Sequence, residues 1–138
     1  MTSRGLVQIK CPEAATHYET IRKVRQWQDH YDAANALKDC ADSSQLAQSR
    51  EASGALEINR VRLTLPGEYV PQLRHEMFVT DADWIDYVSY HPAFPVKLQL
   101  ITIRVLRDDL GLSEYANDVK AFLAEVDAEC EQIAEWAR

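Results

Sequence analysis

The sequence predicts one α/β domain, and three observations support this class. Segments with alternating apolar residues indicate strands, and segments with apolar residues at steps of three and four indicate helices. The two kinds of segment follow one another along the chain, as in domains that pack helices on a sheet. No internal repeat and no linker divides residues 1–138, so we expect a single domain.

Four segments have the pattern of strands. Gly5–Cys11 is the first, and it places Gln8 and Lys10 on one face and Val7 and Ile9 on the other. The other expected strands are 56–65, 84–90 and 98–106. The last of these carries apolar residues on both faces, which predicts a central position in the sheet.

Three segments have the pattern of helices. They span Glu13–Cys40, Tyr69–Val79 and Leu112–Ala137, and Asp42–Gly54 is either a loop or a frayed helix end. The last helix has an apolar stripe, which is typical of a helix packed on a sheet or on another helix. The stripe residues are Tyr115, Val119, Phe122, Val126, Cys130, Ile133 and Ala137.

The charge is uneven along the chain. The net charge is −7, and residues 108–138 hold nine acids and two bases, so the remainder is neutral. This argues against a protein held on nucleic acid by bulk charge, because phosphate binding needs a basic surface.

The sequence shows no pattern typical of a membrane span, a signal peptide or a zinc site. No apolar run approaches the roughly 18 residues of a membrane span, and Met1–Arg4 lacks the apolar stretch of a signal peptide. The three Cys are widely spaced and have no zinc-site pattern, which indicates reduced thiols and no metal–cysteine site. We therefore expect a cytoplasmic protein that does not bind a membrane.

Three blocks of the sequence match known motifs. Gly5–Pro12 resembles G-L-x-E-I/L-K-C-P, and Pro71–Thr80 resembles Q-x-Q-x-x-M-x-V-T. The third block is a strand pair, in which Trp84–Pro92 resembles W-x-D-F-x-S-Y-D-P and Ile103–Asp109 resembles V-x-R-D-D/E. In these blocks and in their order, the sequence resembles the phage lambda exonuclease and YqaJ-type viral recombinase family.

The resemblance covers roughly residues 4–24 and 66–138, and it implies the C-terminal half of a family member. The segment at about 25–65 then becomes an inserted helix and strand. The implied fold is a truncated PD-(D/E)xK nuclease-like core, with a mixed sheet of about three to four strands flanked by helices and a long C-terminal amphipathic helix.

The family's site binds Mg²⁺ through an Asp and a Glu on adjacent strands, and a Lys orients the attacking water. A metal activates that water and neutralises the leaving oxygen. Here Lys10 matches the Lys and Gln8 matches the Glu, while Met1–Val7 holds no carboxylate to match the Asp.

The helix motif also departs from the family. Gln72 matches its first Gln, but Arg74 matches its second, where a cation would fill the space of a metal. Glu76 is the best candidate to rebuild a site, because it lies one turn from Gln72. The resemblance therefore predicts a degenerate nuclease with vestigial Gln8, Lys10 and Gln72, and no cofactor.

Basic and aromatic residues form a candidate binding surface for a partner protein or for single-stranded nucleic acid. Several acids lie among them, which favours a protein partner or a simple solvated surface. The residues are Arg22, Arg25, Trp27, Arg60, Arg62 and Arg74.

The first functional hypothesis is a non-enzymatic phage or prophage protein that acts by protein–protein contact. Inhibition of a host defence complex, such as a CRISPR effector, or of a host nuclease would be one such role. The alternatives are an Mg²⁺-dependent 5′→3′ DNA exonuclease and a DNA-end-binding recombination protein that does not cut. Weak DNA binding and a homo-oligomer stay open in each case.

Overall fold

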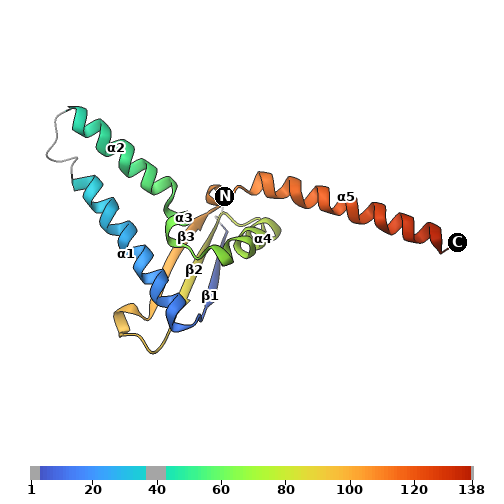
Figure 1. Cartoon of the computed structure of the whole chain (residues 1–138), viewed down its shortest axis with the longest axis horizontal. Helices are drawn as coiled ribbons and strands as arrows, with labels where there is room; N and C mark the ends of the chain where they lie inside the picture. Colours follow the sequence, from blue (N-terminus) through green and yellow to red (C-terminus); the bar gives the residue numbers. More distant parts are fainter. Residues whose placement is uncertain (1–3, 37–42, 138) are drawn as a thin grey trace.

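The computed structural model describes residues 4–36 and 43–137, and a three-stranded sheet lies at its centre. Its strands are β1 (Gly5–Lys10), β2 (Trp84–Tyr90) and β3 (Leu100–Leu106), in the order β1-β2-β3. β1 runs parallel to β2, whereas β3 runs antiparallel to it (Figure 1). The expected α/β class and the expected mixed sheet are confirmed.

The central strand is β2, so the prediction that 98–106 is central is wrong. β3 lies at one edge of the sheet, and its second face is uncovered. Leu100 and Leu106 on that face are 55% and 47% exposed. Val7 and Ile9 of β1 are exposed on the same side, which confirms the predicted alternation of β1. β3 therefore has apolar residues on both faces although one of these faces is exposed to solvent.

The helices among the described residues are α1 (Ala14–Ala36), α2 (Ser43–Ile58), α3 (Arg60–Thr64), α4 (Val70–Thr80) and α5 (Leu112–Trp136). α1, α3 and α4 contact the sheet, whereas α2 packs mainly on α1 and α5 mainly on α4. α1 and α2 lie side by side and extend away from the sheet (Figure 1). Short 3-10 turns precede α4, β3 and α5, at Gly67–Tyr69, Val96–Leu98 and Arg107–Leu110.

The described residues from 43 to 64 are largely helical, so the expected strand at 56–65 is wrong. α2 ends at Ile58 and α3 follows, with Val61 and Thr64 buried on one side of it. Apolar residues at 61, 63 and 65 alternate as in a strand, but helical spacing also fits the buried positions 61 and 64. Residues 43–54 of the expected loop or frayed helix end form a regular part of α2, and residues 37–42 lie outside the described residues.

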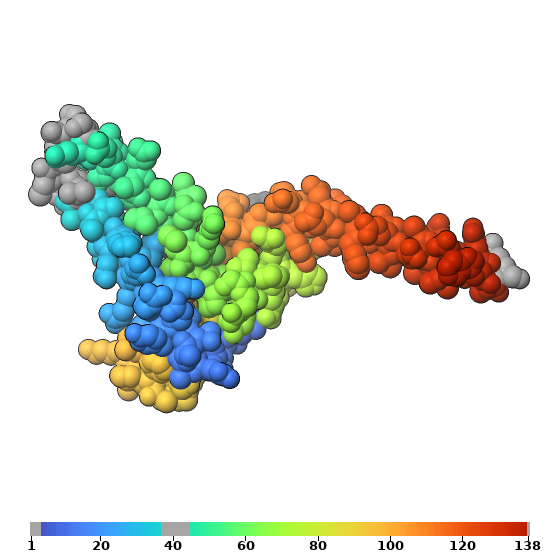
Figure 2. Space-filling view, viewed as in Figure 1, coloured from blue at the N-terminus to red at the C-terminus, as the bar shows by residue number. Residues whose placement is uncertain are grey.

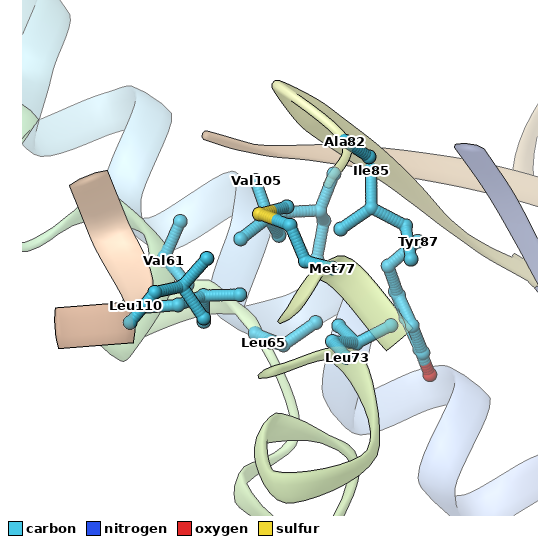
Figure 3. Close-up of a cluster of buried hydrophobic side chains, with 11 residues drawn as sticks. Val61, Leu65, Leu73, Met77, Ala82, Ile85, Tyr87, Val105 and Leu110 are labelled. Carbon is cyan, nitrogen blue, oxygen red and sulfur yellow. The ribbon is translucent and has the colours of Figure 1, made fainter. Parts of the chain in front are cut away.

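The core lies between α4 and the covered face of the sheet. Leu73 and Met77 of α4 pack with Ile85, Tyr87 and Val105, and all five are fully buried (Figure 3). The four-residue step between Leu73 and Met77 places both side chains on the face of α4 that contacts the sheet. This packing fixes the position of α4 relative to the strands.

Within residues 4–36 and 43–137, α5 packs against other elements through its first turns. Tyr115 is hydrogen-bonded to His75 at 2.8 Å, and its ring lies 5.5 Å from that of Phe78. Beyond this contact α5 extends away from the sheet and the other helices (Figures 1 and 2). The expectation that its apolar stripe packs on a sheet or helix therefore holds at Tyr115 and is wrong farther along.

The described helices include none that is both long enough and apolar enough to cross a membrane.

Candidate functional site

A polar cluster joins the covered face of β1 to α4. Lys10 Nζ donates to Gln72 Oε1 at 2.7 Å, although the two residues are 62 positions apart in the chain. Gln72 Nε2 in turn donates to Glu76 Oε1 at 2.7 Å, across one turn of α4. Gln8 completes the group, which we call the Lys10 cluster: Gln8, Lys10, Gln72 and Glu76.

The amide of Gln8 is oriented by its neighbours. With its nitrogen toward Glu76, it donates to the two carboxylate oxygens at 3.0 and 2.9 Å. Its oxygen then accepts from Lys10 Nζ at 3.0 Å and from Gln72 Nε2 at 3.3 Å. An amide orientation is assigned from the hydrogen-bond network, and this one gives both the oxygen and the nitrogen of the Gln8 amide suitable partners. Both amide oxygens thus face the lysine, and both amide nitrogens face the carboxylate.

Two tyrosines line the cluster on the side of the core. Lys10 Nζ lies 5.1 Å from the centre of the Tyr69 ring, a cation–π distance. The Tyr69 and Tyr87 rings are 5.3 Å apart. Burial raises the pKa of Tyr87 to about 12, and the nearby Tyr69 adds to this rise. Tyr87 therefore stays neutral at physiological pH, and Lys10 and Glu76 supply the cluster's opposite charges.

The donors of the Lys10 cluster do not fit a tightly held Mg²⁺. Mg²⁺ prefers anionic oxygens in octahedral geometry. Here Glu76 is the single carboxylate, and the oxygens of Gln8 and Gln72 already accept from the Lys10 ammonium. Among the described residues, no group of three or more His, Cys, Asp or Glu could hold a metal ion.

The structure brings the three vestigial positions together and places Arg74 elsewhere. Gln8, Lys10 and Gln72 belong to one cluster, as their matched motifs imply. Arg74 lies on another side of α4, where its guanidinium is 6.0 Å from the ring of Tyr115 in α5. Arg74 therefore does not fill a metal position in this cluster.

Arg22 and Arg25 lie on α1, beside a surface hollow of about 530 Å³ that Tyr18 and Leu98 also line. Arg22 pairs with Glu19 at 2.7 Å, and this hydrogen bond raises the pKa of Arg22 and lowers that of Glu19. The hollow and Lys10 lie toward the same end of the sheet, where β1 and β2 finish and β3 begins.

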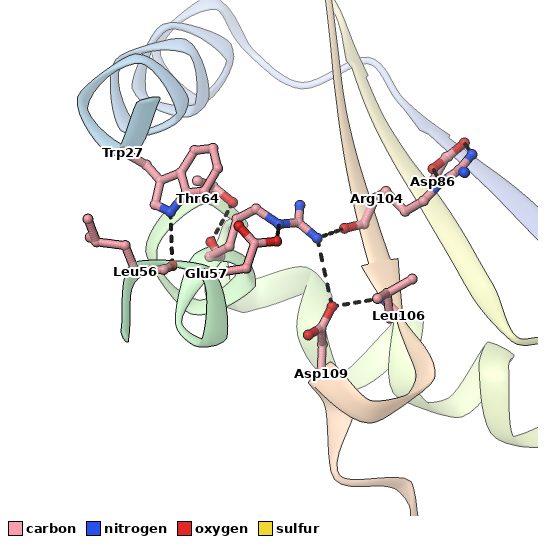
Figure 4. A network of polar contacts seen from close by, with 9 residues as sticks. Trp27, Leu56, Glu57, Thr64, Asp86, Arg104, Leu106 and Asp109 are labelled. Atoms are coloured by element: carbon pink, nitrogen blue, oxygen red, sulfur yellow. Dashed lines mark hydrogen bonds and ion pairs between the residues drawn. The ribbon is translucent and has the colours of Figure 1, made fainter. Parts of the chain in front are cut away.

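Trp27 makes a contact within the protein (Figure 4), and Arg60 also contacts other elements. Trp27 donates its indole N–H to the Leu56 carbonyl at 3.0 Å, joining α1 to α2. Arg60 donates to the Arg104 carbonyl at 2.6 Å and lies 3.9 Å from Asp109. Arg62 beside them is exposed. The expected surface is therefore divided: Arg22 and Arg25 line the hollow, Trp27 and Arg60 hold α2 and α3 in place, Arg62 is exposed, and Arg74 lies beside Tyr115.

Sequence reasoning missed the two tyrosines behind the Lys10 cluster. The register pairs Gln8 with Tyr87, and the alternation of β2 places Tyr87 on the same face as Ile85. This alternation could have predicted that Tyr87 lies beside Gln8, once the face of β1 that carries Gln8 was known.

His17 is buried and hydrogen-bonds Ser89 and the Leu98 carbonyl, each at 2.7 Å, so it joins α1 to the sheet.

The chain matches no protein-family model and no curated protein. Among solved structures it is similar to an alkaline exonuclease, LHK-Exo from Laribacter hongkongensis, with a TM-score of 0.59 and 29% identity. The similarity covers 99% of this chain and 50% of the exonuclease. This chain has a nuclease-like fold.

A second structure of LHK-Exo, in complex with dAMP, gives a TM-score of 0.58 at 29% identity and covers 98% of this chain and 49% of that one. The chain thus spans about half the length of the exonuclease it resembles. The nuclease fold expected from the three sequence blocks is confirmed.

Proposed function

We propose that this chain binds DNA ends through its nuclease fold and does not cut them at the Lys10 cluster. Two findings support DNA as the ligand. The similar solved structures are of an exonuclease, and one of them holds dAMP, a nucleotide. The hydrogen bonds within the Lys10 cluster support the second part of the proposal, that the chain does not cut DNA there. We place this activity in the cytoplasm of a bacterium that carries the gene in a phage or prophage.

The observation that carries the proposal is the closed set of hydrogen bonds among Lys10, Gln8, Gln72 and Glu76. Cleavage of a phosphodiester by a nuclease of this fold needs a metal held by anionic oxygens. In this cluster Lys10 provides the positive charge opposite Glu76, and the amide oxygens are turned toward Lys10. A Mg²⁺ ion would have to displace the ammonium to reach them, with one carboxylate to hold it.

The Arg22–Arg25 hollow supplies the contact with DNA in this proposal. The hollow holds the guanidinium of Arg25, that of Arg22 in its pair with Glu19, and the carboxylate of Asp29. Arg25 and the exposed ring of Tyr18 suit a phosphate and a stacked base. The chain's negative charge is concentrated after residue 107, so residues 1–107 can bind phosphate without a net repulsion of their own. We expect binding to be weak and sensitive to salt.

The test for cutting uses linear duplex DNA with Mg²⁺ or Mn²⁺. We expect neither the natural chain nor its Lys10→Ala variant to release nucleotides. Digestion by the natural chain that Lys10→Ala abolishes would overturn the proposal and establish the exonuclease alternative.

The test for binding compares two variants that each lose one positive charge. Arg25→Ala removes a guanidinium from the hollow, and Lys120→Ala removes a charge from α5. Fluorescence anisotropy with a short 5′-phosphorylated duplex should show weaker binding for Arg25→Ala, with a salt slope smaller by about one. Lys120→Ala should match the natural chain. Equal losses in both variants would show that only bulk charge matters, and the hollow would be rejected.

A protein partner is the second candidate function, and the exposed apolar residues of α5 favour it. Inhibition of a host defence complex or of a host nuclease stays a hypothesis with no residue to support it.

A further inference from the structure

The exposed part of α5 carries a continuous apolar stripe. Successive helical residues are about 100° apart, so Val119, Phe122, Val126, Ile133 and Trp136 lie within one side of the helix. We call these five residues the α5 stripe. Phe122, Ile133 and Trp136 are 62%, 57% and 74% exposed. The stripe extends for roughly 25 Å at 1.5 Å per residue, a length that suits another helix.

Acidic residues border the stripe. Asp118, Glu125 and Glu129 fall along one of its edges by the same helical geometry. The whole of α5 holds seven acids and one base, a net charge of −6. The stripe is therefore an apolar surface in a strongly negative setting.

We propose that the α5 stripe docks a basic amphipathic helix of another protein. An apolar helix face accepts the apolar face of a partner helix, and the contacts recur at steps of three and four residues. Basic residues flanking the partner's apolar face would meet Asp118, Glu125 and Glu129. This complementarity sets both the orientation and the choice of partner.

Charge argues against a second copy of this chain as the partner. Two α5 helices side by side would bring together two segments of net charge −6, and like charges opposed at an interface cost free energy. Membranes with anionic lipids would repel α5 for the same reason, since helices that lie on such membranes carry Lys and Arg on the polar face. A basic helix is the partner that neutralises this surface. The inference is independent of DNA binding.

The first experiment measures binding of two designed peptides to the full chain. Both are amphipathic helices with Leu on the apolar face, and they differ only in having Lys or Glu at the flanking positions. Fluorescence anisotropy should show that the Lys peptide binds more than about tenfold tighter than the Glu peptide. The affinity of the Lys peptide should also fall as salt is raised.

The second experiment separates the stripe from the rest of α5. A Phe122→Ser/Val126→Ser variant should lose about tenfold or more in affinity for the Lys peptide. Ala124→Ser/Ala128→Ser makes the same number of changes on the opposite side of the helix and should bind as the natural chain does. Far-UV circular dichroism checks that both variants keep their helix content.

A third variant tests the acidic border. Asp118→Asn/Glu125→Gln/Glu129→Gln keeps the apolar stripe and removes three negative charges. We expect it to bind the Lys peptide more weakly and with a smaller dependence on salt than the natural chain.

Three outcomes would overturn the inference. Equal affinity for the Lys and Glu peptides would show that the charge of the partner helix does not determine binding. Self-association of the natural chain in sedimentation equilibrium, abolished by Phe122→Ser/Val126→Ser, would show a second copy on the stripe. Binding of neutral lipid vesicles that the same variant abolishes would show a lipid surface there.

Discussion

α4 and α5 meet where His75 contacts Tyr115, and they differ in what covers their apolar residues. In α4 both Leu73 and Met77 are fully buried on the sheet, and the polar side of the same helix completes the Lys10 cluster. In α5 the stripe beyond Tyr115 lies in solvent. A helix of 11 residues thus builds the core and the candidate site, whereas a helix of 25 residues contributes little to either. Length and periodicity do not determine how much a helix stabilises the fold.

The largest expected difference between the two helices concerns stability. Met77→Ala leaves a cavity in the core and should lower the free energy of unfolding by about 2–5 kcal/mol. Phe122→Ala removes an exposed ring and should change it by no more than about 0.5 kcal/mol. Urea unfolding followed by circular dichroism measures both. Similar losses would mean that α5 packs against the domain in solution.

A smaller difference is expected for one substitution made on each helix. Glu76→Gln replaces the carboxylate that accepts from the amides of Gln8 and Gln72, and it presents an amide nitrogen to their nitrogens. It should cost about 1 kcal/mol. Glu125→Gln on α5 should change stability by less than about 0.5 kcal/mol, because that side chain is exposed. If Glu76→Gln proved neutral, the hydrogen bonds of the Lys10 cluster would not form in solution.

The smallest expected effect is on the pH dependence of stability, and it arises from Asp86 on β2. Two hydrogen bonds of 2.8 Å from Arg104 lower the pKa of Asp86. A carboxyl whose pKa is lowered by folding stabilises the protein above its unfolded pKa, and this contribution is lost as the pH falls through the folded value. Asp86→Asn should therefore lower the Tm at about pH 7, and this difference should shrink as the pH falls below the ordinary pKa of an Asp carboxyl.

The control for this prediction is Asp127→Asn, the same substitution at an exposed position of α5. It should leave the Tm unchanged at about pH 7. A Tm difference for Asp86→Asn that persisted in acid would assign the effect to packing and not to the ion pair.

The sequence predicted the bounds of most helices and strands better than it predicted what packs against each of them. The expected strand 84–90 has the same bounds as β2, and the expected helix 112–137 agrees with α5 to within one residue. Val61 and Leu63 were misassigned to a strand because a short run of alternating apolar residues also occurs in a short helix. The stripe of α5 showed that one side of the helix is apolar, but periodicity carries no information about what covers that side.

The candidate site was predictable in part. The alternation of β1 placed Gln8 and Lys10 on one face, and helical spacing placed Gln72 near Glu76. Their meeting followed from the resemblance to a family, because no local pattern joins residues more than 60 positions apart. The orientation of the amides and the position of Arg74 beside α5 depend on tertiary packing, which a single sequence does not specify.

The central claim is that Lys10 and the two amides leave no place for a tightly bound metal beside Glu76. Isothermal titration of the full chain with Mn²⁺, with Glu76→Gln as the control, tests it most directly. We expect binding no tighter than about millimolar, equal in both proteins. Micromolar binding by the natural chain that Glu76→Gln abolishes would contradict the account and restore the metal-dependent nuclease.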